Sequence, residues 1–73
     1  MGKSKFLPGL DQKSIMGLTD EAVLYGNAKA NGNNGYEITH TFDFAVGYDT
    51  NGNITNTLKV YVRDDKVQTA FPY

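Results

Sequence analysis

The chain has 73 residues, a hydrophobic content of 40%, no cysteine, and 7 Lys and Arg against 8 Asp and Glu, which gives a formal net charge of −1. A chain of this length forms a single domain with a small core, and the absence of thiols argues against disulfides and structural zinc. The near-zero net charge argues against the strongly basic surface of many nucleic-acid-binding domains, and no apolar run reaches the roughly 18 residues of a membrane span.

The first third of the chain predicts an extended arm followed by helix. Residues 1–9 carry two lysines and end in the breaker Pro8-Gly9, so we expect an extended arm that closes in a turn. Residues 10–26 are helix-compatible, with Thr19 before two acidic residues as an N-cap signal and Gly26 as a stop. This segment therefore holds one helix or two short helices with a bend.

A polar loop and a first strand follow. Residues 27–35 are the most polar and glycine-rich part of the chain, and we expect a loop there, as a linker rather than a substrate-side flap. Residues 36–46 then alternate in hydropathy, as a half-buried strand does. One face is apolar except for the only histidine of the chain, and it carries Tyr36, Ile38, His40, Phe42, Phe44 and Val46. The other face is polar and carries Glu37, Thr39, Thr41 and Asp43.

Two further strands complete the chain. Asn51-Gly52 is the strongest hairpin signal, and it separates the first strand from a second over residues 54–63. Asp64-Asp65 predicts another tight turn before a third strand, which ends at Pro72 because proline lacks a backbone N–H for the ladder. The expected fold is α+β: one or two N-terminal helices packed on a twisted antiparallel meander of at least three strands over residues 36–72.

The polar face of this sheet contains the candidate substrate-binding residues. Lys59, Arg63 and Lys66 bring positive charge to a row of hydroxyls and a tyrosine, which suits a phosphate backbone and a stacked base. The register of the third strand decides whether its odd- or even-numbered residues join this face. The candidates for contacting substrate are Thr39, Thr41, Thr57, Tyr61 and Lys66. The alternative is a solvated face, rich in threonine because of its β-propensity.

His40 has two interpretations. On an apolar strand face, a single histidine is commonly a buried side chain that hydrogen-bonds to the backbone. Its imidazole is also suited to general acid or base catalysis at neutral pH, but a bulge near 39–42 is needed to turn it toward the polar face, beside Thr69. The sequence has no metal-ligand cluster, phosphate-binding glycine loop or nucleophile–histidine–acid spacing, so we expect no metal and no cofactor.

Four short motifs occur along the chain, at Ser4–Gly9, Thr39–Asp43 with Val46-Gly47, Asn51–Asn56 and Val67–Pro72. In that order they resemble the C-terminal nuclease domains of bacterial polymorphic and contact-dependent growth inhibition toxins, many of which end in a Thr-Ala-Phe-Pro or Thr-Ala-Tyr-Pro strand. The resemblance covers nearly the whole chain. It implies a metal-independent ribonuclease of the barnase, EndoU, colicin D and RelE fold group, in which RNA lies on the sheet. Such enzymes use the RNA 2′-hydroxyl as nucleophile and leave a 2′,3′-cyclic phosphate.

The resemblance also implies a biological setting. The substrate is RNA, often tRNA, and a cognate immunity protein covers the active site, so the domain is a monomer or forms a 1:1 complex with that protein. The chain is then a fragment of a larger toxin, secreted or delivered from the cell surface, that acts in the cytoplasm of the target cell.

Carried over residue by residue, the resemblance makes His40 the candidate acid or base and Thr69 a candidate for orienting or stabilising the phosphate. Lys59 and Arg63 match no motif, and their charge and strand face assign them to stabilising charge on the phosphate. Two other classes of function stay open. One is a non-enzymatic module that binds a protein through the open face or edge of the sheet, and the other is a protein that inhibits a nuclease.

Overall fold

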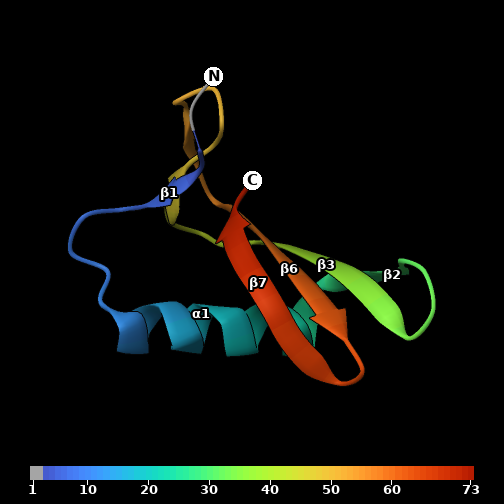
Figure 1. Ribbon diagram of the computed structural model, residues 1–73. Coiled ribbons are helices and arrows are strands. Elements are labelled where there is room, and N and C mark those ends of the chain that lie inside the picture. The colour runs from blue at the N-terminus through green and yellow to red at the C-terminus, as the bar shows by residue number, and fades with distance from the viewer. Residues whose placement is uncertain (1–2) are drawn as a thin grey trace.

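Residues 3–73 are described by a computed structural model, which contains one helix and two antiparallel sheets (Figure 1). Along the chain the elements are β1 (Lys5–Phe6), α1 (Gln12–Tyr25), β2 (Asn27–Ala30), β3 (Gly35–Thr41), β4 (Gly47–Tyr48), β5 (Ile54–Thr55), β6 (Thr57–Arg63) and β7 (Lys66–Pro72). One sheet has the strand order β2-β3-β6-β7 and the other β1-β4-β5. The expected α+β class is confirmed. Residues 1 and 2 of the expected arm lie outside the described part.

One helix, α1, fills the segment in which one or two were expected. Its N-cap is Asp11, whose carboxylate accepts the N–H of Ser14 at 2.8 Å, and this interaction lowers the pKa of Asp11. Thr19 is not a cap, because it is buried within α1 and its hydroxyl donates to the carbonyl of Ile15 at 2.8 Å. The prediction of a helix start at Thr19 is therefore wrong, since the helix face that packs on the sheet continues through this position.

Residues 27–30, assigned to a loop by their composition, form β2 at the edge of the four-stranded sheet. Lys29 lies opposite Glu37 in β3, and every residue of β2 is exposed. An exposed edge strand tolerates the Asn, Lys and Ala that strand propensity disfavours, so composition could not reveal it. The remaining turn needs only residues 31–34, and Gly32 supplies a positive φ of 75° there.

The main strand β3 ends at Thr41 rather than continuing to Val46. Phe42 still bonds to the neighbouring segment, since its N–H donates to the carbonyl of Asn56 at 2.9 Å. Asn56 also interrupts the expected second strand and separates β5 from β6. The chain between β3 and β6 folds with β1 into the small sheet, so the expected meander is divided between two sheets.

Both expected tight turns are confirmed. In the first, the carboxylate of Asp49 accepts the N–H of Asn51 at 2.9 Å, and Gly52 has a φ of 81°. In the second, Asp64 and Asp65 have φ values of 53° and 63°, the left-handed conformation of a two-residue hairpin turn. The second turn joins β6 directly to β7.

The core lies between α1 and the four-stranded sheet. It is formed by the buried residues Ala22, Ile38, Phe42, Val46, Leu58 and Val60. They come from α1, from β3 and β6, and from the segment between β3 and β4. α1 runs along one face of the sheet, and among residues 3–73 no helix or strand covers the other face (Figure 1). We call this second surface the open face.

Two glycines give opposite predictions for replacement by alanine. A Cβ on Gly47 in β4 would collide with the carbonyl of Lys5 and the ring of Pro72, whereas a Cβ on Gly17 in α1 meets nothing within 4 Å. We expect Gly47→Ala to lower the midpoint of thermal unfolding, because β1 and the end of β7 must both move away from β4. Gly17→Ala should raise the free energy of unfolding by about 0.5–1 kcal/mol. A Gly47→Ala protein as stable as the parent in thermal and urea unfolding would contradict the close approach.

Candidate functional site

All of the predicted site residues except His40 have side chains on the open face. Side chains alternate along a strand, and residues directly opposite each other in paired strands share a face. The strand registers assign to the open face Thr39, Thr41, Thr57, Lys59, Tyr61, Arg63, Lys66 and Thr69. Glu37 and Phe71 lie on the same face.

A bulge in β7 brings both ends of this strand to the open face. Lys66 lies opposite Arg63 and Thr69 lies opposite Tyr61, so β7 has one residue more than β6 between these two pairs. Strict alternation would allow only one of Lys66 and Thr69 to reach the open face, which is the choice that the sequence left open. The extra residue places both on one surface.

Lys59 lies near the middle of the open face, where its ammonium group contacts a carboxylate and an aromatic ring. Its Nζ is 3.3 Å from Oε1 of Glu37 and 3.7 Å from the centroid of the Tyr73 ring, and 12% of its side chain is exposed. Burial lowers the pKa of Lys59, but its interactions with Glu37 and Tyr73 outweigh burial and raise that pKa above the usual 10.5. Lys59 is therefore a positive charge at neutral pH and not a proton acceptor.

Three aromatic rings lie close to Lys59. The rings of Tyr61 and Phe71 are 5.7 Å apart and inclined at 45°, and Phe71 is directly opposite Lys59 in the register. Tyr73 continues the ladder beyond β7, because its N–H donates to the carbonyl of Thr57 at 2.9 Å. Tyr73 is also 58% exposed. Together the three rings make a surface on which a flat ligand such as a nucleobase can stack.

Arg63 is held at the other end of β6. Its Nη1 donates to the carbonyl of Asn33 at 2.9 Å, in the loop between β2 and β3. Arg63 is four residues from Lys59, which corresponds to about 13 Å along a strand. The structure therefore does not bring the two predicted cations together around a single phosphate.

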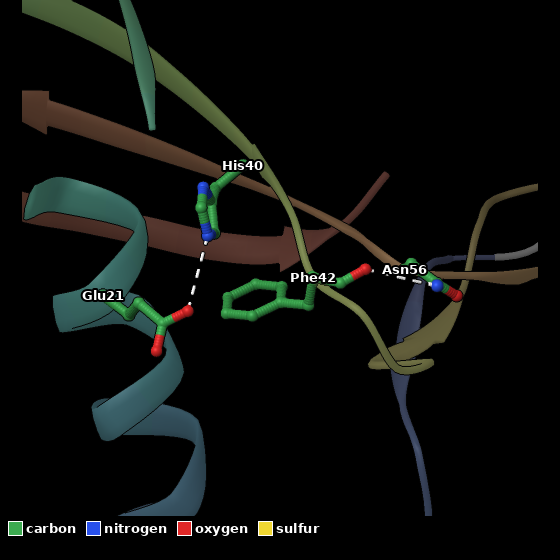
Figure 2. Close-up of polar contacts among 4 residues, drawn as sticks. All are labelled: Glu21, His40, Phe42 and Asn56. Atoms are coloured by element: carbon green, nitrogen blue, oxygen red, sulfur yellow. Dashed lines mark hydrogen bonds and ion pairs between the residues drawn. The ribbon is translucent and has the colours of Figure 1, made fainter. Parts of the chain in front are cut away.

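His40 lies on the helix-facing side of the sheet (Figure 2). Its Nε2 is 3.4 Å from Oε2 of Glu21 on α1, and its ring packs edge-on against Phe42 with the centroids 4.6 Å apart. The register of β3 with β6 is unbroken along the whole of β3, so no bulge turns His40 toward Thr69. With 19% of its side chain exposed, His40 joins the helix to the sheet and is separated from the other predicted site residues.

Glu37 and Tyr73 belong to this surface, but sequence reasoning left them out of the site. Glu37 lies opposite Tyr61, contacts Lys59, and keeps 32% of its side chain exposed. Hydropathy alternation had already placed Glu37 on the polar face together with Thr39, and this shared face could have identified Glu37 as a site residue. Tyr73 gave no signal, because the strand was expected to end one residue earlier.

Comparisons with protein families, with characterised proteins and with solved structures found no match. Within residues 3–73, no helix is long and apolar enough to cross a membrane. The same residues contain no group of three His, Asp or Glu side chains that could hold a metal ion. The geometry of the open face is therefore the main observation on which a functional proposal can rest.

Replacing His40 should change stability and leave the open face intact. We expect His40→Ala to lower the free energy of unfolding by about 1 kcal/mol, because it removes the aromatic contact with Phe42 and the polar contact with the Glu21 carboxylate. A double-mutant cycle with Glu21→Ala should give a coupling energy below about 1 kcal/mol, since solvent screens the 51% exposed carboxylate. Urea unfolding measures both energies. Large NMR shifts at Lys59 or Tyr61 in His40→Ala would contradict the separation of the two faces.

Proposed function

We propose that this domain binds single-stranded RNA on its open face and cleaves it without a metal ion. The observation that supports this proposal is the Glu37–Lys59 ion pair, which lies among hydroxyls and aromatic rings on the open face of the sheet. A carboxylate beside a fixed positive charge is a combination that can move a proton and stabilise a phosphate. The resemblance to bacterial toxin nucleases implies the same class of reaction on RNA, often tRNA, but its candidate acid or base, His40, lies on the other face of the sheet.

RNA binding relies on stacking and on charge. Bases stack on Tyr61, Phe71 and Tyr73, and a stacked base contributes about 1–3 kcal/mol to binding. Lys59 and Arg63, about 13 Å apart along β6, contact different phosphates of one strand. Tyr73 covers part of the Lys59 ammonium, so a bound base competes with this ring for the cation. Only unpaired RNA exposes its bases to such a surface, which favours loops and single-stranded ends.

In the proposed cleavage reaction, Glu37 takes the role of proton acceptor that the motif resemblance gave to His40. The Glu37 carboxylate takes the proton of the 2′-hydroxyl, and the 2′-oxygen bonds to the phosphorus of the adjacent phosphate. The bond from phosphorus to the 5′-oxygen then breaks, the 5′-oxygen gains a proton from water, and a 2′,3′-cyclic phosphate remains. Lys59 stabilises the charge that develops on the phosphate oxygens, and the Thr69 hydroxyl donates a hydrogen bond to them.

The biological setting that the resemblance implies is part of the same proposal. The domain belongs to a larger toxin, secreted or delivered from the cell surface, and acts on RNA in the cytoplasm of the target cell. A cognate immunity protein forms a 1:1 complex with the domain and covers the open face, where the exposed ring of Tyr73 is available for contact.

The variants Glu37→Gln and Glu21→Gln form a matched test of the proton acceptor. Each replaces by an amide one carboxylate that contacts a basic side chain, and the two contacts lie on opposite faces of the sheet. We expect Glu37→Gln to slow RNA cleavage by about 10²- to 10⁴-fold and Glu21→Gln to leave the rate unchanged. Cleavage of total tRNA in the presence of a chelator, with detection of cyclic phosphate ends, measures the rate. Equal rates for both variants would exclude Glu37, and intact RNA at high concentration of the parent protein would exclude the nuclease.

The variants Tyr61→Ala and Phe71→Ala test the stacking surface. We expect each to weaken binding of single-stranded RNA by about 5- to 150-fold, which corresponds to about 1–3 kcal/mol for one stacked base. Tyr25→Ala is the control, because Tyr25 is a 73% exposed tyrosine on α1. Fluorescence anisotropy with a labelled 2′-O-methyl RNA, which has no free 2′-hydroxyl, measures affinity without cleavage. If all three variants bind as the parent does, the open face is not the RNA site.

A second candidate function, the binding of an extended protein segment, is favoured by the edge of the sheet at β7. Within residues 3–73, β7 pairs only with β6, so its outer edge presents backbone N–H and C=O groups that an added strand can satisfy. An apolar cavity of about 250 Å³ lies beside this edge and is lined by Ile15, Met16, Thr19, Asp20, Val67 and Ala70. A protein with this function alone leaves RNA intact, which the tRNA assay detects.

A further inference from the structure

A cavity of about 650 Å³ lies between the N-terminal arm and the turn that joins β4 to β5. It is lined by Lys3, Lys5, Tyr48 and residues 49–52, and we call it the N-terminal cleft. We propose that the N-terminal cleft binds phosphates of the same RNA strand that lies on the open face. This inference rests on the proposed function and extends the RNA-binding surface beyond the four-stranded sheet.

The charges in the N-terminal cleft favour an anionic ligand. Lys3 and Lys5 are exposed, and within residues 3–73 neither forms an ion pair with a carboxylate. Asp49 also lines the cleft, but its carboxylate already accepts the backbone N–H groups of Asn51 at 2.9 Å and Asn53 at 3.0 Å. Two ammonium groups therefore line the cleft without a carboxylate partner among residues 3–73, in a protein whose formal net charge is −1.

The backbone positions these lysines. Lys5 lies directly opposite Tyr48 in the pairing of β1 with β4, so both side chains are on one face of the small sheet. Lys3 is two residues before Lys5 and lines the same cleft. The neighbouring Phe6 packs against the core, and the N–H of Leu7 donates to the carbonyl of Val46 at 3.0 Å. These two contacts anchor the arm directly after Lys5.

The N-terminal cleft and the end of the open face are joined by one turn, because Gly47 packs against Pro72 while the next residue, Tyr48, projects with Lys5 from the opposite face of the small sheet. The turn residues 49–51 that line the N-terminal cleft also line a second cavity of about 430 Å³, together with Phe71, Pro72 and Tyr73. Figure 1 shows that the small sheet rises from one end of the large sheet, the end at which β7 finishes and the C-terminus lies. A strand of RNA that stacks on Phe71 and Tyr73 has to bend around the 49–51 turn, which lines both cavities, to reach the two lysines.

A single-stranded nucleic acid fits this arrangement better than a small anion. Lysines bind phosphate as point charges, and a strand presents a phosphate at every nucleotide, so one chain can contact Lys59, Lys5 and Lys3 in succession. Tyr48 adds a hydroxyl and an exposed ring at the edge of the cleft, where a base can stack. The N-terminal cleft then serves as the part of the binding surface that selects longer RNA over short fragments.

Binding of two 2′-O-methyl RNAs, one of about 4 and one of about 12 nucleotides, tests the proposal, because site sizes of single-strand binders span this range. The variants are Lys5→Gln, the double variant Lys3→Gln with Lys5→Gln, and Lys13→Gln as the control at an exposed position of α1. We expect each cleft lysine removed to weaken binding of the longer RNA by about fivefold at 0.1 M salt. The slope of log affinity against log salt should fall by about 0.7 per lysine. Lys13→Gln should bind the longer RNA with the affinity and salt slope of the parent protein. None of the variants should change the affinity for the shorter RNA.

The outcomes separate this inference from the proposed function. If the double variant binds the longer RNA with the parent's affinity and salt slope while Tyr61→Ala weakens binding, the N-terminal cleft is not part of the RNA surface and the open face remains the site. If neither RNA binds the parent protein, both proposals fail. Inorganic phosphate is a separate probe: if it saturates the cleft in an NMR titration and the longer RNA shifts no residue there, the cleft takes a small anion and the inference is overturned.

Discussion

The unbroken pairing of β3 with β6 is the constraint on which the rest of the structure depends. Every residue of β3 lies directly opposite one of β6, so the two strands divide their side chains between the same two faces. Ile38 and Val60 turn toward α1 and are buried, while Glu37 and Lys59 turn away from it. A slip of one residue would exchange the two sets and expose the core, which is why the buried positions specify the open face as strongly as they specify the fold.

One polar contact lies on each side of the sheet, Glu21–His40 and Glu37–Lys59, and their surroundings differ. The Glu21–His40 pair joins α1 to β3 beside an aromatic ring, so it contributes to the packing of helix on sheet. The Glu37–Lys59 pair lies among threonine hydroxyls and aromatic rings on a surface without a covering helix or strand in residues 3–73. Histidine is the residue type usually chosen for proton transfer, but position decides what a group can reach, and Glu37 is the group that a ligand on the open face meets.

The local signals in the sequence predicted local structure well. Asn51-Gly52 and Asp64-Asp65 marked turns correctly because these residues tolerate the backbone conformations that tight turns require. Alternation placed Thr39, Lys59 and Tyr61 on a common face, which the registers confirm. The edge strand β2 and the helix interior at Thr19 were missed, because an exposed strand carries little hydropathy signal and a threonine hydroxyl bonds equally well at a cap or to a carbonyl one turn earlier.

By itself, the amino-acid sequence determined the α+β class, the two turns and the division of the main strands into an apolar and a polar face, since these follow from backbone preference and a period of two. Only the tertiary structure decided which residues meet across the open face. Three features depend on register and on pairing between distant segments. They are the bulge in β7 that places Lys66 and Thr69 on one face, the contact of Lys59 with Tyr73, and the approach of Lys3 and Lys5 to the 49–52 turn. The position of His40 also depended on strand register, because only an unbroken pairing of β3 with β6 holds that side chain against α1.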